Sequence, residues 1–242
     1  MSADCCGIGR FIVDYFKLTL TSEETYERIT DEAKHTPPTN RKAFWDTIDY
    51  VSSPIPNELY TALKKCNIDD RCPMRALVIG RINDMAILYL LKSEWHVTVV
   101  DPSHNALSKL KSTCIQANRG ALIKNLSLVH KSVEDYQFPS QVKLILAFES
   151  FSYCNPLQFK TLWTRAHHAL SKNGIIAGNF RLRPATRDEE NAERVIKGAW
   201  YITEPCLPAL LEDQKYQKEF SETHTPLMQS HPTDIRFIAR KV

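Results

Sequence analysis

A lone glycine, Gly80, and an acid, Asp101, each follow a short apolar run in this sequence. Gly80 ends the run that begins at Ala76, and Asp101 ends the next run, about 20 residues later, a spacing typical of nucleotide-binding βα units. A glycine in the first turn lets the backbone approach a ligand, and an acid after the second strand can accept hydrogen bonds from a ribose diol. The pair therefore indicates a nucleoside site, although an acid such as Asp101 also occurs as a plain turn residue.

Polar side chains follow two later apolar runs. Glu149 and Tyr153 come after the run at 143–147, and Asn179 and Arg181 come after the next one. Ligands in open α/β sheets bind at the carboxyl ends of the strands, so we expect these side chains to face a substrate. Glu149 could accept a proton from an amine or hydroxyl group as a general base. The alternative is that Glu149 is an exposed acid at a strand end.

A parallel sheet is the element that would bring these strand ends together. Short apolar runs recur at 76–79, 97–100, 126–129, 143–147 and 175–177. Helical spacing separates them, for example at Leu88 and Leu91 and in the segment from Pro156 to Leu170. Gly174 follows that last helix, where a left-handed residue commonly ends a helix. Repeated strand–helix units predict an α/β fold with a doubly wound, mostly parallel sheet.

The last third of the chain has a different pattern. Segments 215–222 and 234–240 alternate as strands, and the connection between them contains Pro226 and Pro232. A connection of about ten residues is too short for a parallel crossover. We therefore expect a C-terminal antiparallel strand pair, which completes a seven-stranded sheet.

The first third reads as helical. Thr21 and Glu24 form a capping-box start, and Tyr26, Ile29 and Ala33 follow at helical spacing. We predict an N-terminal helical cap over residues 1–72 and a Rossmann-like domain over residues 73–242.

Composition narrows the class of protein. The 242 residues include 31 basic and 28 acidic side chains that are well mixed, so there is no clear nucleic-acid signal. No apolar run is long enough for a membrane span, and charged residues near the N-terminus argue against a secretory signal. The seven cysteines are odd in number and scattered, without metal-ligand spacing. This favours reduced thiols and a cytoplasmic location, with no metal site expected. The oligomeric state is not indicated.

Six stretches together resemble class I S-adenosylmethionine-dependent methyltransferases. Segments 76–80, 88–91 and 96–103 resemble the first two βα units of that family. Segment 132–138, followed by 143–149, resembles its third-strand loop and fourth strand. Segment 234–241 is similar to the closing strand of the small-molecule and tellurite-resistance-type branch. The resemblance covers residues 73–242.

This resemblance implies S-adenosyl-L-methionine as the cofactor and a small molecule as the methyl acceptor. Gly80 would be the first glycine of the cofactor loop, Asp101 the ribose ligand, and Ser132 with Val133 would lie at the adenine edge. Glu149 and Tyr153 would be the catalytic side chains.

The loop departs from the family pattern at several positions. Val78 stands where the family usually has an acid, and Ile82 and Asp84 stand where it has further glycines. Ser132 replaces the usual acid on the adenine side. An Asp84 carboxylate near the carboxylate of the cofactor would repel it unless displaced.

Two alternatives therefore stay open. The first is a catalytically inactive methyltransferase-like module with a binding or regulatory role. The second is a nicotinamide-dependent dehydrogenase, because Asp101 would also suit that cofactor; the single glycine and the antiparallel ending argue against it.

Overall fold

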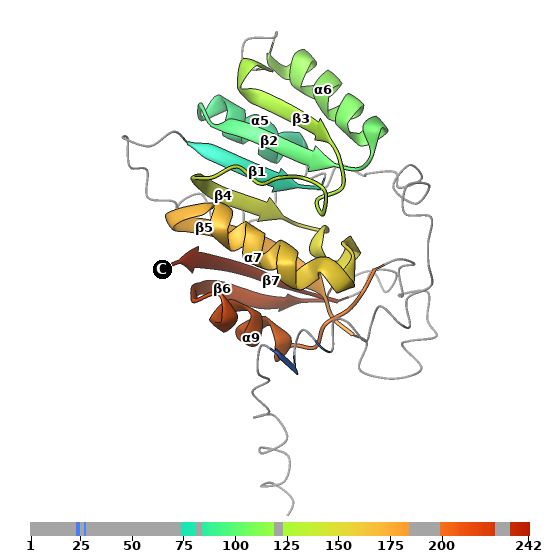
Figure 1. Ribbon diagram of the computed structural model, residues 1–242. Helices are drawn as coiled ribbons and strands as arrows, with labels where there is room; N and C mark the ends of the chain where they lie inside the picture. Colours follow the sequence, from blue (N-terminus) through green and yellow to red (C-terminus); the bar gives the residue numbers. More distant parts are fainter. Residues whose placement is uncertain are drawn as a thin grey trace, which may run out of the picture.

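A seven-stranded sheet forms the centre of the molecule (Figure 1). The computed structural model describes residues 23–24, 27, 74–80, 84–118, 123–183, 199–225 and 233–242. The strands are β1 (Arg75–Ile79), β2 (His96–Asp101), β3 (Leu126–His130), β4 (Val142–Ala147), β5 (Leu170–Arg181), β6 (Tyr216–His224) and β7 (Asp234–Lys241). The helices are α5 (Asp84–Lys92), α6 (His104–Asn118), α7 (Phe159–Ala169) and α9 (Cys206–Asp213), with 3-10 turns η1 (Ile123–Asn125), η2 (Phe151–Tyr153) and η3 (Pro156–Gln158).

The order of the strands is β3-β2-β1-β4-β5-β7-β6. β1 pairs in parallel with β2 and β4, and the same direction continues to β3 and β5. β7 runs antiparallel to both β5 and β6, as its reversed arrow in Figure 1 shows. These pairings confirm the predicted mostly parallel sheet and its C-terminal antiparallel pair.

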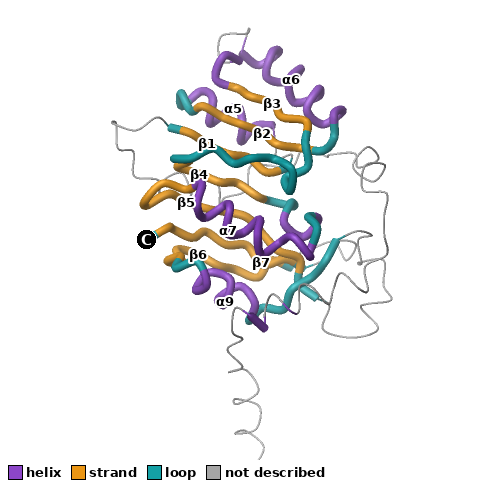
Figure 2. The backbone as a smooth tube through the Cα atoms, viewed as in Figure 1, coloured by secondary structure: helices purple, strands orange, loops and turns teal. Residues whose placement is uncertain are grey.

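Alternate residues of β1 pack into two separate cores. Ala76 and Val78 join the apolar side chains of α5 and α6, whereas Leu77 and Ile79 join those of α7 and α9. All four are buried, as expected for a parallel strand covered on both faces. Helices therefore lie on both sides of the sheet (Figure 2), and the carboxyl ends of the parallel strands share one edge.

Local interactions fix the helices beside that edge. The Ser103 hydroxyl accepts the Ala106 N–H at 3.2 Å and so satisfies one of the free donors at the start of α6. On the opposite face, the buried Trp163 indole donates to the Leu210 carbonyl at 3.0 Å and links α7 to α9.

The expected role of Gly174 was wrong. α7 ends at Ala169, and Gly174 lies inside β5 without a positive φ. The left-handed residue is instead Asn173, with φ 61°, which asparagine tolerates better than most side chains. A Cβ at Gly174 would lie 2.9 Å from the Ser171 carbonyl oxygen and 3.2 Å from that of Val142. Gly174 therefore permits a close backbone approach.

The predicted cap over residues 1–72 lies outside the described residues, except that Glu23, Glu24 and Glu27 are helical. In the described part of the chain, no helix has both the length and the apolarity to cross a membrane.

Candidate functional site

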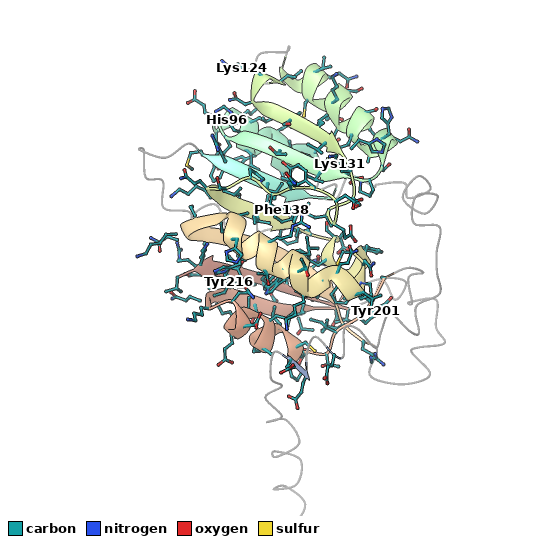
Figure 3. All side chains as sticks on the ribbon, in the orientation of Figure 1. His96, Lys124, Lys131, Phe138, Tyr201 and Tyr216 are labelled. Atoms are coloured by element: carbon teal, nitrogen blue, oxygen red, sulfur yellow. The ribbon has the colours of Figure 1, made fainter. Side chains whose placement is uncertain are left out.

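A cavity of about 570 Å³ opens at the carboxyl edge of the sheet. This volume falls within the roughly 300–1,000 Å³ of small-ligand sites. Figure 3 labels Lys131, one of its lining residues, on the side toward which the arrows of β1 to β4 point. The lining comes from the ends of β1, β2 and β3 and from the segment around η2 and η3: Ile79, Gly80, Val100, Asp101, Pro102, His130, Lys131, Ser132, Val133, Glu134, Asp135, Ser150, Tyr153, Cys154, Asn155 and Gln158.

Five of the six predicted site residues line this one cavity. They are the four expected to bind the cofactor, Gly80, Asp101, Ser132 and Val133, together with Tyr153. Separate strand ends supply them, so their proximity comes from the order of the strands. Glu149, the sixth, is not among the lining residues.

Gly80 brings bare backbone to the cavity wall. Its φ is +74°, a left-handed value that glycine adopts without steric cost. Its N–H donates to the Val100 carbonyl at 2.8 Å, so the β1–β2 pairing extends to the edge of the cavity. A Cβ at this position would lie 2.4 Å from the Ser150 hydroxyl oxygen. The position therefore requires glycine for two reasons, the positive φ and the close Ser150 hydroxyl.

Asp101 lies at the end of β2, and its side chain is fully buried. Its Oδ1 accepts the Ser103 N–H at 2.7 Å, which holds the carboxylate beside the N-terminus of α6, where the helix dipole favours a negative charge. The carboxylate is therefore a fixed group that only accepts hydrogen bonds, as binding of a ribose diol requires.

Ser132 and Val133 belong to a tight turn after β3. The Ser132 hydroxyl donates to Asp135 Oδ2 at 2.7 Å, and the Asp135 N–H donates back to the Ser132 oxygen at 3.2 Å. Val133 packs against the core from this turn. Ser132 itself carries no charge, but the turn places the Asp135 carboxylate in the same wall. Asp135 was not among the predicted site residues; its position three residues after a serine was the available signal.

Asp84 does not line the cavity. Its Oδ2 accepts the Thr113 hydroxyl of α6 at 2.9 Å. Together with burial, the charge of Asp84 raises the pKa of the nearby Cys114 thiol to about 11. The Asp84 carboxylate is thus bonded to α6 and is not part of the cavity wall. Ile82 lies outside the described residues, and Val78 is a buried core residue of β1.

Tyr153 reaches the cavity from η2 and is largely buried. Arg181, at the end of β5, forms a side-chain hydrogen bond with its hydroxyl. Burial raises the pKa of Tyr153 above its ordinary value, against the opposing effect of Arg181. The phenol therefore stays protonated at neutral pH.

Glu149 lies outside the cavity in a network of polar side chains. Its Oε1 accepts the Asn179 amide at 2.6 Å, and its Oε2 accepts the Arg181 guanidinium. Asn179 also donates to the buried Asp234 at 2.6 Å. Glu149 has a φ of 53°, a conformation that non-glycine residues adopt at a cost of about 1–2 kcal/mol. The structure thus brings Glu149, Asn179 and Arg181 together, and it adds Asp234 of β7, which the sequence analysis did not identify.

The charges around the cavity are mostly negative. Asp101, Glu134 and Asp135 contribute carboxylates to the lining, and Lys131 contributes an ammonium group. Such a lining favours a cationic ligand over an anionic one. Among the described residues, no cluster of histidine, cysteine and acidic side chains could hold a metal ion.

Comparison with protein families gives one match: residues 84–174 match the family model described as a methyltransferase domain. The matched segment runs from the start of α5 to the beginning of β5. No curated protein sequence matches the chain closely enough to serve as a relative.

Solved structures share the fold at low sequence identity. The 1,6-didemethyltoxoflavin-N1-methyltransferase of Burkholderia thailandensis, solved with S-adenosylhomocysteine, has a TM-score of 0.59 at 14% identity, covering 100% of this chain and 93% of its own. The N-methyltransferase NodS of Bradyrhizobium japonicum gives 0.57 at 14% identity, covering 90% and 98%. TehB of Haemophilus influenzae gives 0.63 at 15% identity, covering 84% and 67%.

Proposed function

Since this chain has the fold of class I S-adenosylmethionine-dependent methyltransferases and matches the methyltransferase domain over residues 84–174, we propose that it binds S-adenosyl-L-methionine and transfers its methyl group to a small molecule. The observation that carries the proposal is that Gly80, Asp101, Ser132 and Val133 line one cavity of suitable size. The small-molecule acceptor is supported by structural neighbours such as the Burkholderia enzyme, whose structure contains 1,6-didemethyltoxoflavin.

The residues present suit the cofactor. Asp101 would accept hydrogen bonds from the ribose hydroxyls, and the backbone at Ser132 and Val133 would meet the adenine. Gly80 would allow close approach beneath the methionine moiety, because it presents backbone at the cavity wall. When bound, the cofactor supplies an electrophilic methyl group on a sulfonium. The protein then mainly aligns the acceptor with that methyl group, and such alignment can lower a barrier by about 7–11 kcal/mol.

The charge of the cavity supports this cofactor over a nicotinamide dinucleotide. S-adenosylmethionine carries a positive sulfonium, whereas a dinucleotide carries a negatively charged pyrophosphate. Three carboxylates against one lysine in the lining oppose the pyrophosphate. The loop also keeps only one glycine, Gly80, where a pyrophosphate site usually has several so that the backbone can approach the phosphates.

Tyr153 and Glu149 have different tasks in this proposal. Tyr153 lines the cavity and is the candidate for direct contact with the methyl acceptor. Glu149 accepts hydrogen bonds on both oxygens, from Asn179 and Arg181. Both carboxylate oxygens of Glu149 are thus occupied by donors outside the cavity lining, so the arrangement favours a positioning role over the general-base role that we expected.

A binding titration tests the proposal against both alternatives. We expect the purified chain to bind S-adenosylmethionine and S-adenosylhomocysteine with one-to-one stoichiometry and to show no saturable binding of NAD at the same concentrations. Binding of NAD with no binding of S-adenosylhomocysteine would support a dehydrogenase. Absence of binding by either would support the inactive module, which the departures at Val78, Ile82 and Asp84 motivate.

A further inference from the structure

The connection from β3 to β4 crosses the sheet without a helix. It covers residues 131–141, all of which the structure describes, and the strand order takes it past β2 and β1. Parallel strands are usually joined through a helix, whose carbonyls accept hydrogen bonds from within the helix. Figure 2 shows this crossover as a loop on the same side of the sheet as α7, where its apolar side chains pack. Its carbonyls therefore need other donors, from side chains or from water.

Arg165 of α7 supplies donors to two of these carbonyls. Its Nη1 donates to the Glu134 carbonyl at 2.7 Å, and its Nη2 donates to the Tyr136 carbonyl. The guanidinium also lies over the ring of Phe138, which Figure 3 labels, with Cζ 4.9 Å from the ring centroid. At this distance a cation and an aromatic ring attract each other. One side chain thus contacts three alternate residues of the crossover.

The guanidinium group suits this contact. It is planar, it stays charged, and it presents its N–H donors in a rigid fork. Its two arms can therefore hold two carbonyls at a fixed spacing, whereas a lysine ammonium on a flexible stem would not fix that spacing. Because the Arg165 side chain is half-buried, these hydrogen bonds compete less with water than they would on the surface.

The part of the crossover that Arg165 holds is also a wall of the cavity. Residues 131–135 line it. Glu134 is held twice, because its carbonyl accepts from Arg165 and its carboxylate Oε1 accepts the Asn155 N–H at 2.6 Å. Asn155 belongs to another segment of the lining, just before η3. A shift of the crossover would therefore disturb two segments of the lining together.

We propose that Arg165 is a positioning residue whose guanidinium holds the helix-free crossover in place as the wall that meets the adenine of the cofactor. This rests on the proposed function, which places the adenine at Ser132 and Val133. Arg165 does not itself line the cavity, so it acts through the crossover. Without Arg165, the wall is in its binding position for only part of the time. The apparent dissociation constant then rises in inverse proportion to that fraction.

Ligand binding to Arg165→Met provides the first test. Methionine keeps an unbranched side chain but cannot donate a hydrogen bond. S-adenosylhomocysteine and adenosine are titrated calorimetrically, well below the melting temperature. We expect both dissociation constants to rise by the same factor, because adenosine carries the part of the cofactor that the wall meets. The factor is about tenfold if the wall is in place for about a tenth of the time.

The matched control is Arg240→Met. Arg240 also donates to a backbone carbonyl, that of Asn173, and it pairs with β5 at Ile175, near the end of the sheet opposite to the cavity. This variant should bind both ligands like the wild type.

Hydrogen exchange of the ligand-free protein provides a second, independent test. We expect the amides of residues 131–138 to exchange faster in Arg165→Met than in the wild type, with the amides of β5 and β7 unchanged, because the opening is local. A purely structural role would lower the melting temperature but leave the dissociation constants of the folded protein unchanged. If Arg165→Met does not fold, Arg165→Lys takes its place. Lysine keeps a charge near Phe138 but not the fixed fork, so both ligands should again bind more weakly than to the wild type.

The proposal is overturned if the folded variant binds both ligands like the wild type, or if only S-adenosylhomocysteine binds more weakly. It is also overturned if the amides of residues 131–138 exchange as in the wild type. Failure of the proposed function is distinguishable, because the wild type would then bind neither ligand. The exchange measurement needs no ligand and would still decide whether Arg165 holds the crossover.

Discussion

Gly80 and Ser150 meet at the wall of the candidate site: a Cβ on residue 80 would lie 2.4 Å from the Ser150 hydroxyl oxygen. Ser150 is itself held there, since its hydroxyl lies 2.8 Å from the Phe148 carbonyl oxygen and also contacts that of Ile79. The contact joins the ends of β1 and β4, which are neighbours in the sheet.

Substitution of Gly80 should therefore damage both stability and binding. In Gly80→Ala, the positive φ alone costs about 1–2 kcal/mol, and the Ser150 contact adds to it. We expect the free energy of unfolding in urea to fall by at least that amount and S-adenosylhomocysteine binding to weaken. In the background Ser150→Ala, where the close oxygen is absent, the same substitution should cost less. Equal losses in both backgrounds would show that the contact has no influence.

The charges of the lining should set the preference for cofactor over product. S-adenosylmethionine carries one more positive charge than S-adenosylhomocysteine. Removal of the Asp135 carboxylate in Asp135→Asn should therefore lower the affinity for S-adenosylmethionine relative to the affinity for S-adenosylhomocysteine. For a charge pair partly screened by solvent, the effect is about threefold. Lys131→Met should raise this relative affinity by a similar factor. Calorimetric titrations of both ligands at low and high salt measure it; changes of the same sign in the two variants would refute the electrostatic account.

His167 should make the fold sensitive to acid. Burial, Lys241 and His168 lower the pKa of His167 from 6.5 to about 4. Between these values the unfolded chain binds more protons than the folded one, so stability rises with pH across this window and falls as the pH drops through it. The free energy of unfolding, measured in urea between pH 4.5 and 7.5, should rise less steeply with pH in His167→Asn than in the wild type. His168→Asn, at the exposed neighbouring position, removes only the smallest of the three causes and should keep most of the wild-type dependence of stability on pH.

Much of the sheet follows from local patterns. The apolar runs that end at Ile79, Val100 and Ala147 could be read as buried strands because both faces of a parallel sheet exclude water. The short connection between β6 and β7 was enough to predict that they are antiparallel. Asp101 could be predicted as a site residue because it directly follows the apolar run that forms β2.

The features that could not be predicted from the sequence depend on contacts between segments that are distant along the chain. The Glu149 network needs β4, β5 and β7 side by side, so the isolated residue looks like a free acid. Asp84 looks harmful to cofactor binding until α6 supplies Thr113 as its hydrogen-bond donor. Gly174 follows a helix in sequence, but the pairing of β5 with β4 decides its conformation. In each case, tertiary packing overrides the preference of the single residue.

The most direct measurement is the affinity of S-adenosylhomocysteine for three proteins: the wild type, Asp101→Asn and Asp84→Asn. The asparagine at 101 can still accept the Ser103 N–H and preserve the turn, but it loses the charge that would bind the ribose hydroxyls. Hydrogen bonds to a charged group contribute about 1.5–3 kcal/mol, so we expect the dissociation constant to rise by about 10-fold to 100-fold in Asp101→Asn. It should stay near the wild-type value in Asp84→Asn. No binding by the wild type, or equal binding by wild type and Asp101→Asn, would contradict the account.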